Sequence, residues 1–308
     1  MKIISFIKNI FRKRDIRFVY YKKIYRKWIF FLKPVKCSSL DFEIHMVTCK
    51  NHFLNAFWCL KTFYYYSRLR PKLVVHDDGS LGEKRAKIFL KHFVNCRIIR
   101  RETADEELNQ FLSDYKCCQK ARSNKDFFCS LKLFDAFYYA GAEKILVLDA
   151  DVLFFKYPAE IVEFIKENKP FFNSDYQNSY AYPASKLSQL MGIDILPRVN
   201  AGLTCLRKEW LVNNLDLMEN YFEKGQTWRK GAYVNQHEQT LSALLLSKYK
   251  AIRLSENYQI SAKPITGQTV SHHFCSDGSR INFYKQGLSF LRRNKFLQKL
   301  NRCSQASE

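Results

Sequence analysis

The sequence predicts an α/β fold. From about residue 41, short apolar runs alternate with longer amphipathic stretches, the pattern of strands and helices in an α/β domain. Residues 144–148 form an apolar run without polar alternation, which indicates a central strand covered on both faces. The chain has 308 residues, 47% hydrophobic and 16% aromatic, with only 10 Gly and 7 Pro. This composition excludes a collagen-like or wholly disordered chain and allows a sizeable core.

The first half of the chain supplies two strands and several helices. Residues 43–48 are expected to form the first strand and residues 73–75 the second. Between them, aromatic and aliphatic residues recur at helical spacing: Phe53, Phe57, Leu60 and Tyr64. Capping-box spacings, Ser80 with Glu83 and Thr103 with Glu106, predict the starts of the next two helices.

The second half continues the alternation around the central strand. We expect helices at residues 131–140 and 159–167 and a strand at residues 199–206. A helix is expected to start at Asn235, with Glu238 as its third residue, and to run to about Ser247. A last strand is predicted near residues 269–274. No internal repeat or composition shift indicates a further domain after residue 40.

The positive charge is concentrated at the N-terminus. Lys and Arg number 51 against 29 Asp and Glu, a formal net charge of +22. Residues 1–36 hold twelve of the basic residues and one acid, Asp15, so they carry +11, half of the excess. Apolar residues are interleaved with this charge at helical spacing: Ile3, Ile4, Ile7, Ile10 and Phe11, followed by the cluster at residues 28–31.

We therefore expect two parts, a basic amphipathic segment at residues 1–40 and an α/β domain at residues 41–308. The segment favours contact with an anionic membrane surface. The alternative is a helix that packs on the domain by its apolar side, and nucleic-acid binding is the least favoured partner. No window is long and apolar enough for a spanning helix, and no signal peptide is indicated. The ten cysteines show no metal-type spacing, and several lie inside apolar runs as reduced core thiols do. Together with the lack of a secretion signal, this favours a cytoplasmic location, expected to be peripheral on the inner face of the membrane.

The first candidate site is Asp149-Ala150-Asp151. Asp-x-Asp alone is a weak motif, but here both carboxylates follow the most hydrophobic strand, at the edge where open α/β sheets bind ligands. Two such carboxylates repel each other unless a cation lies between them. The alternative interpretation is a solvated strand end whose aspartates cap the next helix.

The second candidate is His273, with His272 as the alternative. Two carboxylates and an imidazole suit Mn²⁺ or Mg²⁺ with positions left open for a diphosphate. Arg280 and Lys285 follow closely and are expected to neutralise phosphate charge. As surface cations in so basic a chain, each also has a purely solvated interpretation.

The order of these pieces resembles a glycosyltransferase of the GT-A fold, and within it the retaining family 8 type, which includes glycogenins and lipopolysaccharide galactosyltransferases. The likeness covers about residues 41–290. It is carried by the strand at 43–48, the acidic turn at 77–80, Asp149-Ala150-Asp151, Asn200-Ala201-Gly202, Glu238-Gln239 and His273-Phe274. The resemblance implies an open mixed sheet flanked by helices. It also implies a nucleotide-sugar donor, expected to be a UDP-sugar, bound across the end of the sheet.

Residue by residue, the resemblance assigns the metal to Asp149, Asp151 and His273. It places several further residues at the donor: Thr48, Asp77, Lys132, Asn200, Gly202 and Arg280. Glu238 and Gln239 match the family's pair beside the transferring sugar and are the expected catalytic residues. The family's Gly and Lys-Pro-Trp after the late His are absent here, and Thr48-Cys49-Lys50-Asn51 replaces the nucleoside-binding pattern. The chain therefore resembles a divergent relative.

The predicted function is metal-dependent, retaining transfer of a hexose to a saccharide or lipid-linked glycan, as in glycan or lipopolysaccharide biosynthesis. A haloacid-dehalogenase-like phosphatase also uses a strand that ends in Asp-x-Asp, but it needs a downstream acidic pair that this chain lacks. A nucleotidyltransferase is excluded because residues 49–67 contain no Gly for a phosphate loop. A catalytically inactive basic adaptor on the same scaffold is the non-enzymatic alternative.

Overall fold

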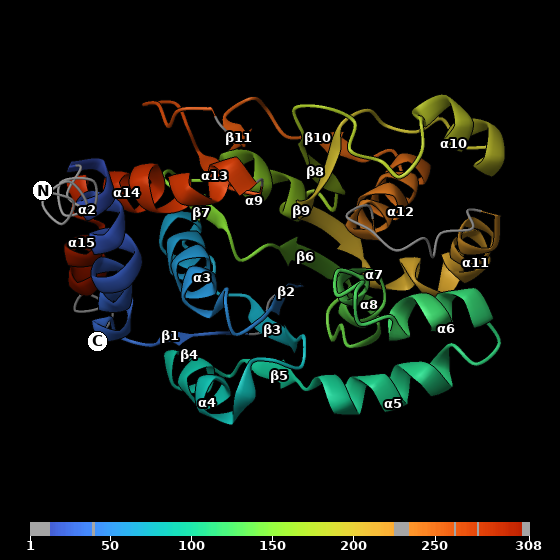
Figure 1. The fold of residues 1–308 in the computed structure, drawn as a ribbon, viewed down its shortest axis with the longest axis horizontal. Helices are drawn as coiled ribbons and strands as arrows, with labels where there is room; N and C mark the ends of the chain where they lie inside the picture. The colour runs from blue at the N-terminus through green and yellow to red at the C-terminus, as the bar shows by residue number, and fades with distance from the viewer. Residues whose placement is uncertain (1–12, 39–40, 225–233, 262, 276, 304–308) are drawn as a thin grey trace, which may run out of the picture.

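The computed structural model describes residues 13–38, 41–224, 234–261, 263–275 and 277–303. Its centre is a seven-stranded sheet (Figure 1). In spatial order the strands are β10 (Ile252–Arg253), β8 (Phe171–Ser174), β9 (Val199–Arg207), β6 (Lys144–Leu148), β2 (Phe42–Thr48), β3 (Lys72–Asp77) and β5 (Arg97–Ile99). Strand β9 runs antiparallel to both of its neighbours, and the other pairings are parallel. The sheet is therefore mixed, as expected.

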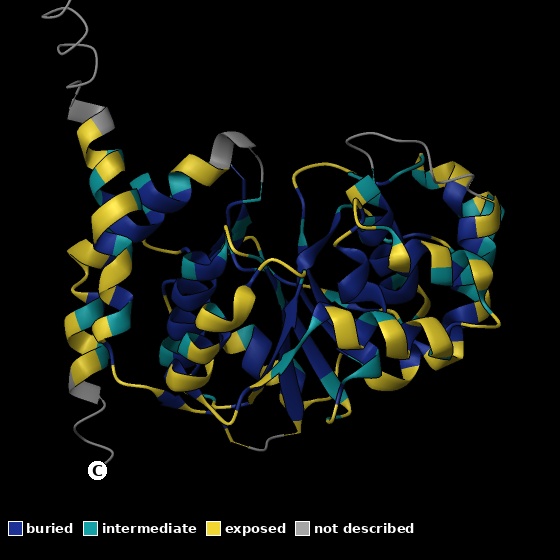
Figure 2. Cartoon of the chain, turned by 60° about the horizontal axis from the view of Figure 1, so that its bottom comes forward, coloured by how far each residue is buried: buried dark blue, intermediate teal, exposed yellow. Residues whose placement is uncertain are grey.

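Strand β6 confirms the prediction of a central strand covered on both faces. Ile145, Leu146 and Leu148 have no exposed surface. Alternate side chains of a strand point to opposite faces, and here they enter two different hydrophobic cores. Ile145 and Val147 belong to one core, and Leu146 and Leu148 belong to the other. The absence of polar alternation in this run thus reflects two covered faces (Figure 2).

Helices cover each face of the sheet. One core contains residues of α3 (Phe53–Ser67), α4 (Gly82–His92) and α9 (Ala159–Lys166). The other contains residues of α5 (Arg101–Phe111), α6 (Lys116–Ser123), α7 (Ser130–Leu133), α8 (Asp135–Tyr138), α10 (Ala184–Met191), α11 (Leu215–Lys224) and α12 (Val234–Lys248). Short 3-10 turns, η3 (Lys208–Trp210) and η4 (Val212–Asn214), connect β9 to α11. This arrangement leaves the ends of the strands free to present polar residues.

A second sheet of three strands lies beside the first. It contains β11 (Tyr258–Ile260), β12 (Ser271–His273) and β7 (Val152–Phe154), with β12 in the middle. Strand β12 is antiparallel to β7 and parallel to β11. Since β7 follows β6 after only three residues, the chain passes from one sheet to the other at the predicted Asp-x-Asp motif. A small pair, β1 (Val35–Lys36) with β4 (Phe93–Val94), joins the N-terminal segment to the domain.

The two helices predicted from capping-box spacings are present, but neither capping box forms. Helix α4 starts at Gly82, and the Ser80 hydroxyl donates to the Asp78 carboxylate instead of capping it. The reason is that Asp77 Oδ1 already accepts from the backbone N–H groups of Gly79 and Leu81. Helix α5 starts at Arg101, ahead of Thr103.

Two other predicted helices differ in detail from the structure. The helix predicted at residues 131–140 is two short helices, α7 and α8, which meet at Phe134 with φ −116° and ψ −58°. Asn235 lies inside α12, which starts at Val234, rather than at its cap. Strands β5 and β8 were not predicted; both are short and flanked by polar residues.

The N-terminal segment packs against the domain over residues 20–35. It continues as α2 (Lys13–Val19), a π-helical turn η1 (Tyr20–Ile24) and a 3-10 turn η2 (Tyr25–Phe31). Trp58 Nε1 donates to the carbonyl of Arg26 at 2.9 Å, and Lys61 Nζ donates to the carbonyl of Lys33 at 2.5 Å. Ile29 has no exposed surface. Part of the apolar side of this stretch is thus covered, as the packing alternative expects, while Trp28 and Phe31 remain exposed. Residues 3–11 of the predicted amphipathic face lie outside the described residues.

The C-terminal helices lie next to this segment (Figure 1). They are α13 (Asp277–Asn282), a π-helical turn η5 (Phe283–Leu288), α14 (Ser289–Arg293) and α15 (Phe296–Cys303). Among the described residues, no helix combines the length and the apolar character required to cross a membrane.

Candidate metal and donor site

The turn between β6 and β7 positions the two predicted carboxylates. The backbone N–H of Asp149 donates to the carbonyl of Gly202 on the adjacent β9 at 2.8 Å. The N–H of Val152 then donates to the Asp149 carbonyl at 3.2 Å, which closes a tight turn around Ala150. Both side chains remain partly exposed, Asp149 by 22% and Asp151 by 15%. The turn therefore projects two carboxylates from the edge of the main sheet.

The second sheet brings His273 to these carboxylates. In the antiparallel register, His273 of β12 lies opposite Val152 of β7, next to Asp151. The His273 Nε2 atom is 3.1 Å from Asp151 Oδ1 and 3.6 Å from Asp149 Oδ2. One ligand atom from each of the three residues lies within 4.8 Å of the others. The three residues predicted to form a metal site are thus adjacent in space, although His273 lies more than 120 positions after the two aspartates in the sequence.

Asn200 fixes the orientation of the histidine ring. His273 Nδ1 lies 2.8 Å from Asn200 Oδ1, and this oxygen also accepts from the N–H of Gly202 at 3.0 Å. Because an amide oxygen only accepts, Nδ1 must be the donor in this bond. When the ring is neutral, it presents the lone pair of Nε2 to the carboxylates, which is the arrangement of a metal-binding imidazole held by a hydrogen bond at its other nitrogen.

The charges of the cluster are coupled. Burial lowers the pKa of His273, but the carboxylates of Asp151 and Asp149 outweigh this effect and raise it above its usual value. Burial raises the pKa of Asp151, but His273 lowers it below its usual range. Each group therefore favours the charged form of its neighbour. The buried Nε2 atom faces these two carboxylates, Asp151 Oδ1 at 3.1 Å and Asp149 Oδ2 at 3.6 Å, and neither contact has the full geometry of a hydrogen bond. An imidazole nitrogen facing two carboxylates is a donor set that fits a divalent cation.

Gly202 allows the close approach of β9 to this cluster. A Cβ atom at this position would lie 2.2 Å from His273 Cε1 and 2.7 Å from Asp149 Oδ2. Real Cβ atoms essentially never approach other atoms so closely, so the glycine is required for space rather than for an unusual backbone angle. Its role in the predicted Asn-Ala-Gly segment is thus explained by the geometry.

A buried lysine links the carboxylate cluster to α12. Lys132 Nζ lies 2.6 Å from Asp149 Oδ1 and 3.4 Å from Glu238 Oε1. Burial lowers the pKa of Lys132, but the two carboxylates raise it well above its usual value. Burial raises the pKa of Glu238 to about 7 despite the nearby ammonium. Lys132 therefore stays charged while Glu238 titrates near neutrality.

Gln239 is held by residues that the sequence did not reveal. Its Nε2 donates to Asp175 Oδ2 at 3.2 Å and to the Ser179 carbonyl at 3.4 Å. Asp175 follows β8 directly and is 6% exposed. The signal was present, since the short apolar pair Phe171-Phe172 leads into polar residues, but a strand of four residues was too short to be recognised.

These groups surround one cavity of about 340 Å³. Of the predicted site residues, it is lined by Lys132, Asp149, Asp151, Asn200, Gly202, Glu238, Gln239, His273 and Arg280. Its lining also includes residues that were not predicted, among them His52, Phe128, Asp175, Tyr176 and Cys275. The volume lies within the range of small-molecule and cofactor sites in proteins.

Four predicted residues lie outside this lining. Thr48 is 2% exposed at the end of β2, and Asp77 is 4% exposed. Both carboxylate oxygens of Asp77 are engaged, one by backbone N–H groups and the other by Arg100 at 3.1 Å. His272 points away from the cluster, because adjacent strand residues face opposite sides, and its Nε2 lies 2.8 Å from the Ser261 carbonyl. Lys285 lies over the ring of Phe18.

The arrangement of strands also matches known structures. Mouse xyloside xylosyltransferase 1, in its apo form, superposes with a TM-score of 0.51 and 13% identity, over 80% of this chain and 99% of that chain. The chain has the GT-A glycosyltransferase fold. At this identity the likeness establishes the GT-A fold alone, and it confirms the predicted fold of a divergent chain.

Two further GT-A structures are similar at lower scores. The galactosyltransferase LgtC, in complex with donor and acceptor sugar analogues, has a TM-score of 0.48 and 14% identity, over 76% of this chain and 87% of that chain. Core-mannan synthase A from Aspergillus fumigatus, in a form with Mn and GDP, has a TM-score of 0.45 and 9% identity, over 68% and 70%. No family model and no curated protein sequence matches the chain.

Proposed function

We propose that the protein is a metal-dependent glycosyltransferase that moves a hexose from a UDP-sugar to a saccharide or lipid-linked glycan. The observation that carries this proposal is the Asp149, Asp151 and His273 cluster, which opens into a cavity at the strand edge of a GT-A fold. Mn²⁺ or Mg²⁺ held there would act as a Lewis acid on the departing diphosphate. The remaining roles belong to the side chains of the chain itself.

The donor end of the cavity carries a cation as well as the carboxylates. Arg280, on α13, lines the same cavity as the cluster. Breakage of the bond between the anomeric carbon and the diphosphate oxygen builds negative charge on the leaving group, which a guanidinium stabilises by charge-assisted hydrogen bonds. Arg280 thus replaces the family's absent Lys-Pro-Trp segment in our proposal.

The sugar end of the cavity is supported by α12. The side-chain amide of Gln239 is oriented by its bonds to Asp175 and Ser179. The carbonyl oxygen of that amide is an acceptor that can stabilise oxocarbenium character on the sugar ring. Glu238, bonded to Lys132, contributes a second oxygen nearby. We assign these two residues to positioning and stabilising the transferring sugar in a reaction that retains configuration at the anomeric carbon.

Two aromatic rings at the cavity favour a saccharide acceptor. Phe128 and Tyr176 both line the cavity, yet they are 43% and 55% exposed. Large aromatic rings left in water beside a polar cavity offer a flat apolar face to a ligand, with the Tyr hydroxyl as a polar handle. A sugar ring, with an apolar face and a hydroxylated rim, fits this combination.

We also propose that residues 1–36 contact an anionic membrane on its cytoplasmic side.

The proposal is tested by hydrolysis of a panel of nucleotide sugars in the presence of Mn²⁺, followed by transfer to glycan acceptors. At least one UDP-hexose is expected to be turned over only with the metal. Asp151→Ala should abolish that turnover because it removes one carboxylate from the cluster, whereas Asp194→Ala, an exposed aspartate outside the cavity, should leave it unchanged. Equal turnover by Asp151→Ala and the parent protein would reject the site assignment.

A catalytically inactive adaptor and a phosphatase remain the competing functions. The phosphatase needs a second acidic pair next to the Asp-x-Asp motif, and here the neighbour that completes the cluster is an imidazole. Release of phosphate from a sugar phosphate without nucleotide would favour the phosphatase. The GT-A fold, with a cavity that contains two carboxylates and the His273 imidazole, supports the transferase instead.

A further inference from the structure

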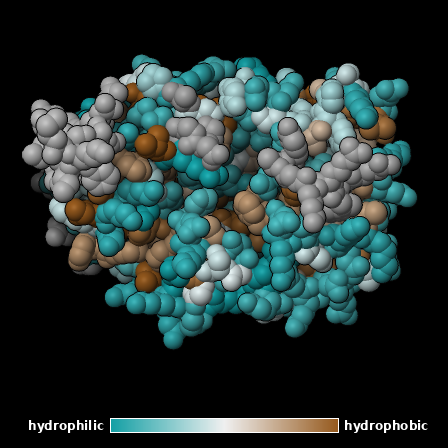
Figure 3. Space-filling view, in the orientation of Figure 1, coloured by the Kyte–Doolittle hydropathy of each residue, from teal (hydrophilic) through white to brown (hydrophobic). Residues whose placement is uncertain are grey.

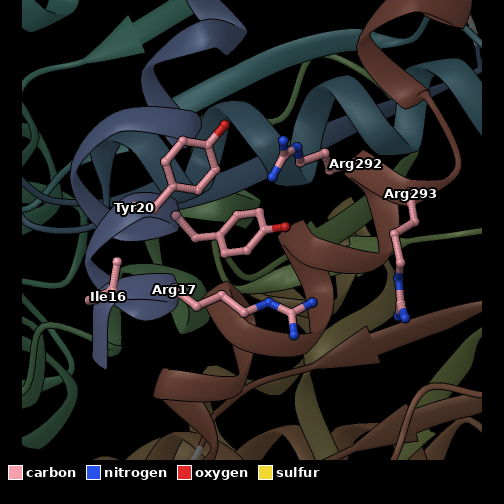
Figure 4. A pocket seen from close by; sticks show the side chains of 6 residues that line it. Ile16, Arg17, Tyr20, Arg292 and Arg293 are labelled. Atoms are coloured by element: carbon pink, nitrogen blue, oxygen red, sulfur yellow. The ribbon is translucent and has the colours of Figure 1, made fainter. Parts of the chain in front are cut away.

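Two clefts lie between the N-terminal helical stretch and the C-terminal helices. The first, about 560 Å³, is lined by Ile16, Arg17, Tyr20, Tyr21, Arg292 and Arg293 (Figure 4). The second, about 440 Å³, is lined by Trp28, Phe31, Lys295 and Leu297 among others, and again by Arg292. Because Arg292 lines both, the clefts belong to one surface. We call the side chains of residues 16–32 and 292–301 that line these clefts the terminal surface.

Contacts between the N-terminal and C-terminal segments hold this surface in place without a bound partner. Arg17 Nη2 donates to Ser289 Oγ at 2.8 Å, and Arg26 Nη1 donates to the Tyr284 hydroxyl at 3.3 Å. The guanidinium of Arg292 lies 5.0 Å from the ring centroid of Tyr20, a cation–π contact. Two arginines of the first cleft, Arg17 and Arg292, therefore come from opposite ends of the sequence and are held by neighbouring side chains.

The surface combines two strongly basic segments. Residues 16–36 contain seven Lys and Arg and residues 283–301 contain five, and neither segment contains an acidic residue. Twelve like charges on adjacent segments create a positive potential that attracts an anionic partner. The first 36 residues alone hold only part of this charge, so the C-terminal helices extend the basic region that the sequence indicated.

Exposed apolar side chains distinguish this surface from a purely ionic one. Phe31 is 83% exposed and Trp28 48%, and both line the second cleft. Ile16, in the first cleft, is 47% exposed, and Val19 and Ile24 on the same stretch are 51% and 52% exposed. Apolar side chains are visible at the surface on this side of the molecule (Figure 3). A nucleic-acid backbone would compensate the charge but would leave these aliphatic groups in water.

We propose that the terminal surface binds the face of an anionic phospholipid membrane through both chain ends at once. Headgroup phosphates occupy the first cleft between Arg17, Arg292 and Arg293, where guanidinium groups can bind them in bidentate fashion. Trp28 and Phe31 enter the boundary between headgroups and acyl chains, where amphipathic rings are stable. This proposal adds the C-terminal half of the surface, because α14 and α15 lie outside residues 1–36, the segment that the sequence alone indicates for membrane contact.

The test is cosedimentation of the full chain with vesicles. We expect binding to phosphatidylcholine vesicles that contain phosphatidylglycerol and little binding to phosphatidylcholine alone. Three exposed cations of the C-terminal helices are replaced by Ser: Arg293 and Lys295 of the terminal surface, and Lys299, which follows the cleft residue Gln298 in the chain. This change should weaken binding at least tenfold, because each basic residue near an anionic surface contributes about 1 kcal/mol. Phe31→Ser should weaken binding further, since it removes the most exposed apolar ring of the surface.

A matched control removes the same charge elsewhere. Lys84, Lys87 and Lys91 are exposed on α4, and their replacement by Ser lowers the net charge equally. This variant should keep most of the vesicle binding. Equal losses in the two triple variants would show that only net charge matters and would overturn the proposal. Binding of RNA that competes with vesicles, with no effect of Phe31→Ser, would assign the surface to nucleic acid instead.

The readout is independent of catalysis. None of the substituted residues lines the catalytic cavity, so nucleotide-sugar turnover in vesicle-free solution is expected to stay unchanged in every variant. Failure of vesicle binding with intact turnover would reject the terminal surface alone. Absence of turnover with intact vesicle binding would reject the proposed transferase alone. Circular dichroism of each variant, which should match the parent protein, establishes that the substitutions leave the fold intact.

Discussion

The candidate metal site leaves no space for a side chain at Gly202. It lies on β9, where its carbonyl accepts from the Asp149 N–H and its N–H donates to Asn200. The backbone at this point thus contacts both a metal-ligating candidate and the residue that orients His273. His273 and Asp149 occupy the space that a side chain at position 202 would need. Even a single added methyl group should therefore disturb the whole cluster.

We predict that Gly202→Ala will lower Mn²⁺ affinity by at least tenfold while the protein remains folded. The new methyl would lie 2.2 Å from His273 Cε1, so the imidazole or β9 must move. Calorimetric titration with Mn²⁺ measures the effect. Gly267→Ala is the control, because a Cβ at Gly267 meets nothing within 4 Å, and it should bind Mn²⁺ like the parent protein. Unaltered affinity in Gly202→Ala would contradict the proposed ligand set.

At the scale of elements, the N-terminal stretch, α3 and α4 meet around one buried imidazole. His92, at the end of α4, is 5% exposed. Its ring centroid lies 5.6 Å from that of Phe30 on η2 and 5.4 Å from that of Phe57 on α3. Burial, with smaller contributions from Lys61 and Lys91, lowers the pKa of His92 to about 4. The docking of these elements therefore requires the neutral ring.

We predict that His92 makes the protein less stable as pH falls from about 6.5 towards 4. In this interval the unfolded chain, with an ordinary histidine pKa near 6.5, binds a proton that the folded chain does not bind. The unfolding free energy then falls by about 1.4 kcal/mol per pH unit on account of this residue. His92→Phe keeps an aromatic ring in the cluster but cannot titrate, so its stability should fall less between pH 7 and pH 5.

Denaturant unfolding at these two pH values measures the difference. The expected result is a smaller decrease in unfolding free energy for His92→Phe than for the parent protein, by about 2 kcal/mol. The same pH dependence in both proteins would show that the docked elements do not depend on the neutral imidazole. The sign follows from the direction of the pKa shift and holds whatever the stability of the variant at pH 7.

For the whole molecule, the two sheets and the C-terminal helices meet at the candidate metal and donor cavity. Asp149 and Asp151 come from the turn between the sheets, His273 from the second sheet, and Arg280 from α13. A ligand that bridges these groups binds only the folded chain, and it should stabilise the molecule globally by mass action.

We predict that UDP together with Mn²⁺ will raise the melting temperature by several degrees, and that either alone will do so much less. Saturation at a hundred times the dissociation constant stabilises the fold by about 2.7 kcal/mol. The physical reason is that the diphosphate needs a cation to approach Asp149 and Asp151. Differential scanning fluorimetry with UDP, Mn²⁺, both, and Asp151→Ala with both measures the effect. Stabilisation by RNA with a steep salt dependence, and none by UDP with Mn²⁺, would favour the adaptor.

Several parts of the site could be predicted because they depend on local sequence. The apolar run of β6 ending in Asp149-Ala150-Asp151 indicated both a doubly covered strand and a carboxylate pair, and the structure confirms the strand. Thr48 and Asp77 do not line the cavity. Their placement at the donor stays a prediction. Asp77 is also engaged by Arg100, a contact with a later strand end that no local pattern could have indicated.

By itself, the sequence determined the α/β alternation, the carboxylate pair and the division of the positive charge, because these depend on local periodicity and residue type. Only the tertiary structure decided that His273 rather than His272 faces the carboxylates, since this depends on the register of β12 against β7. It also decided that Asp175 holds Gln239 and that α14 and α15 complete the basic surface of the N-terminus. These contacts join residues far apart in the chain, and their geometry follows from the packing of whole sheets and helices.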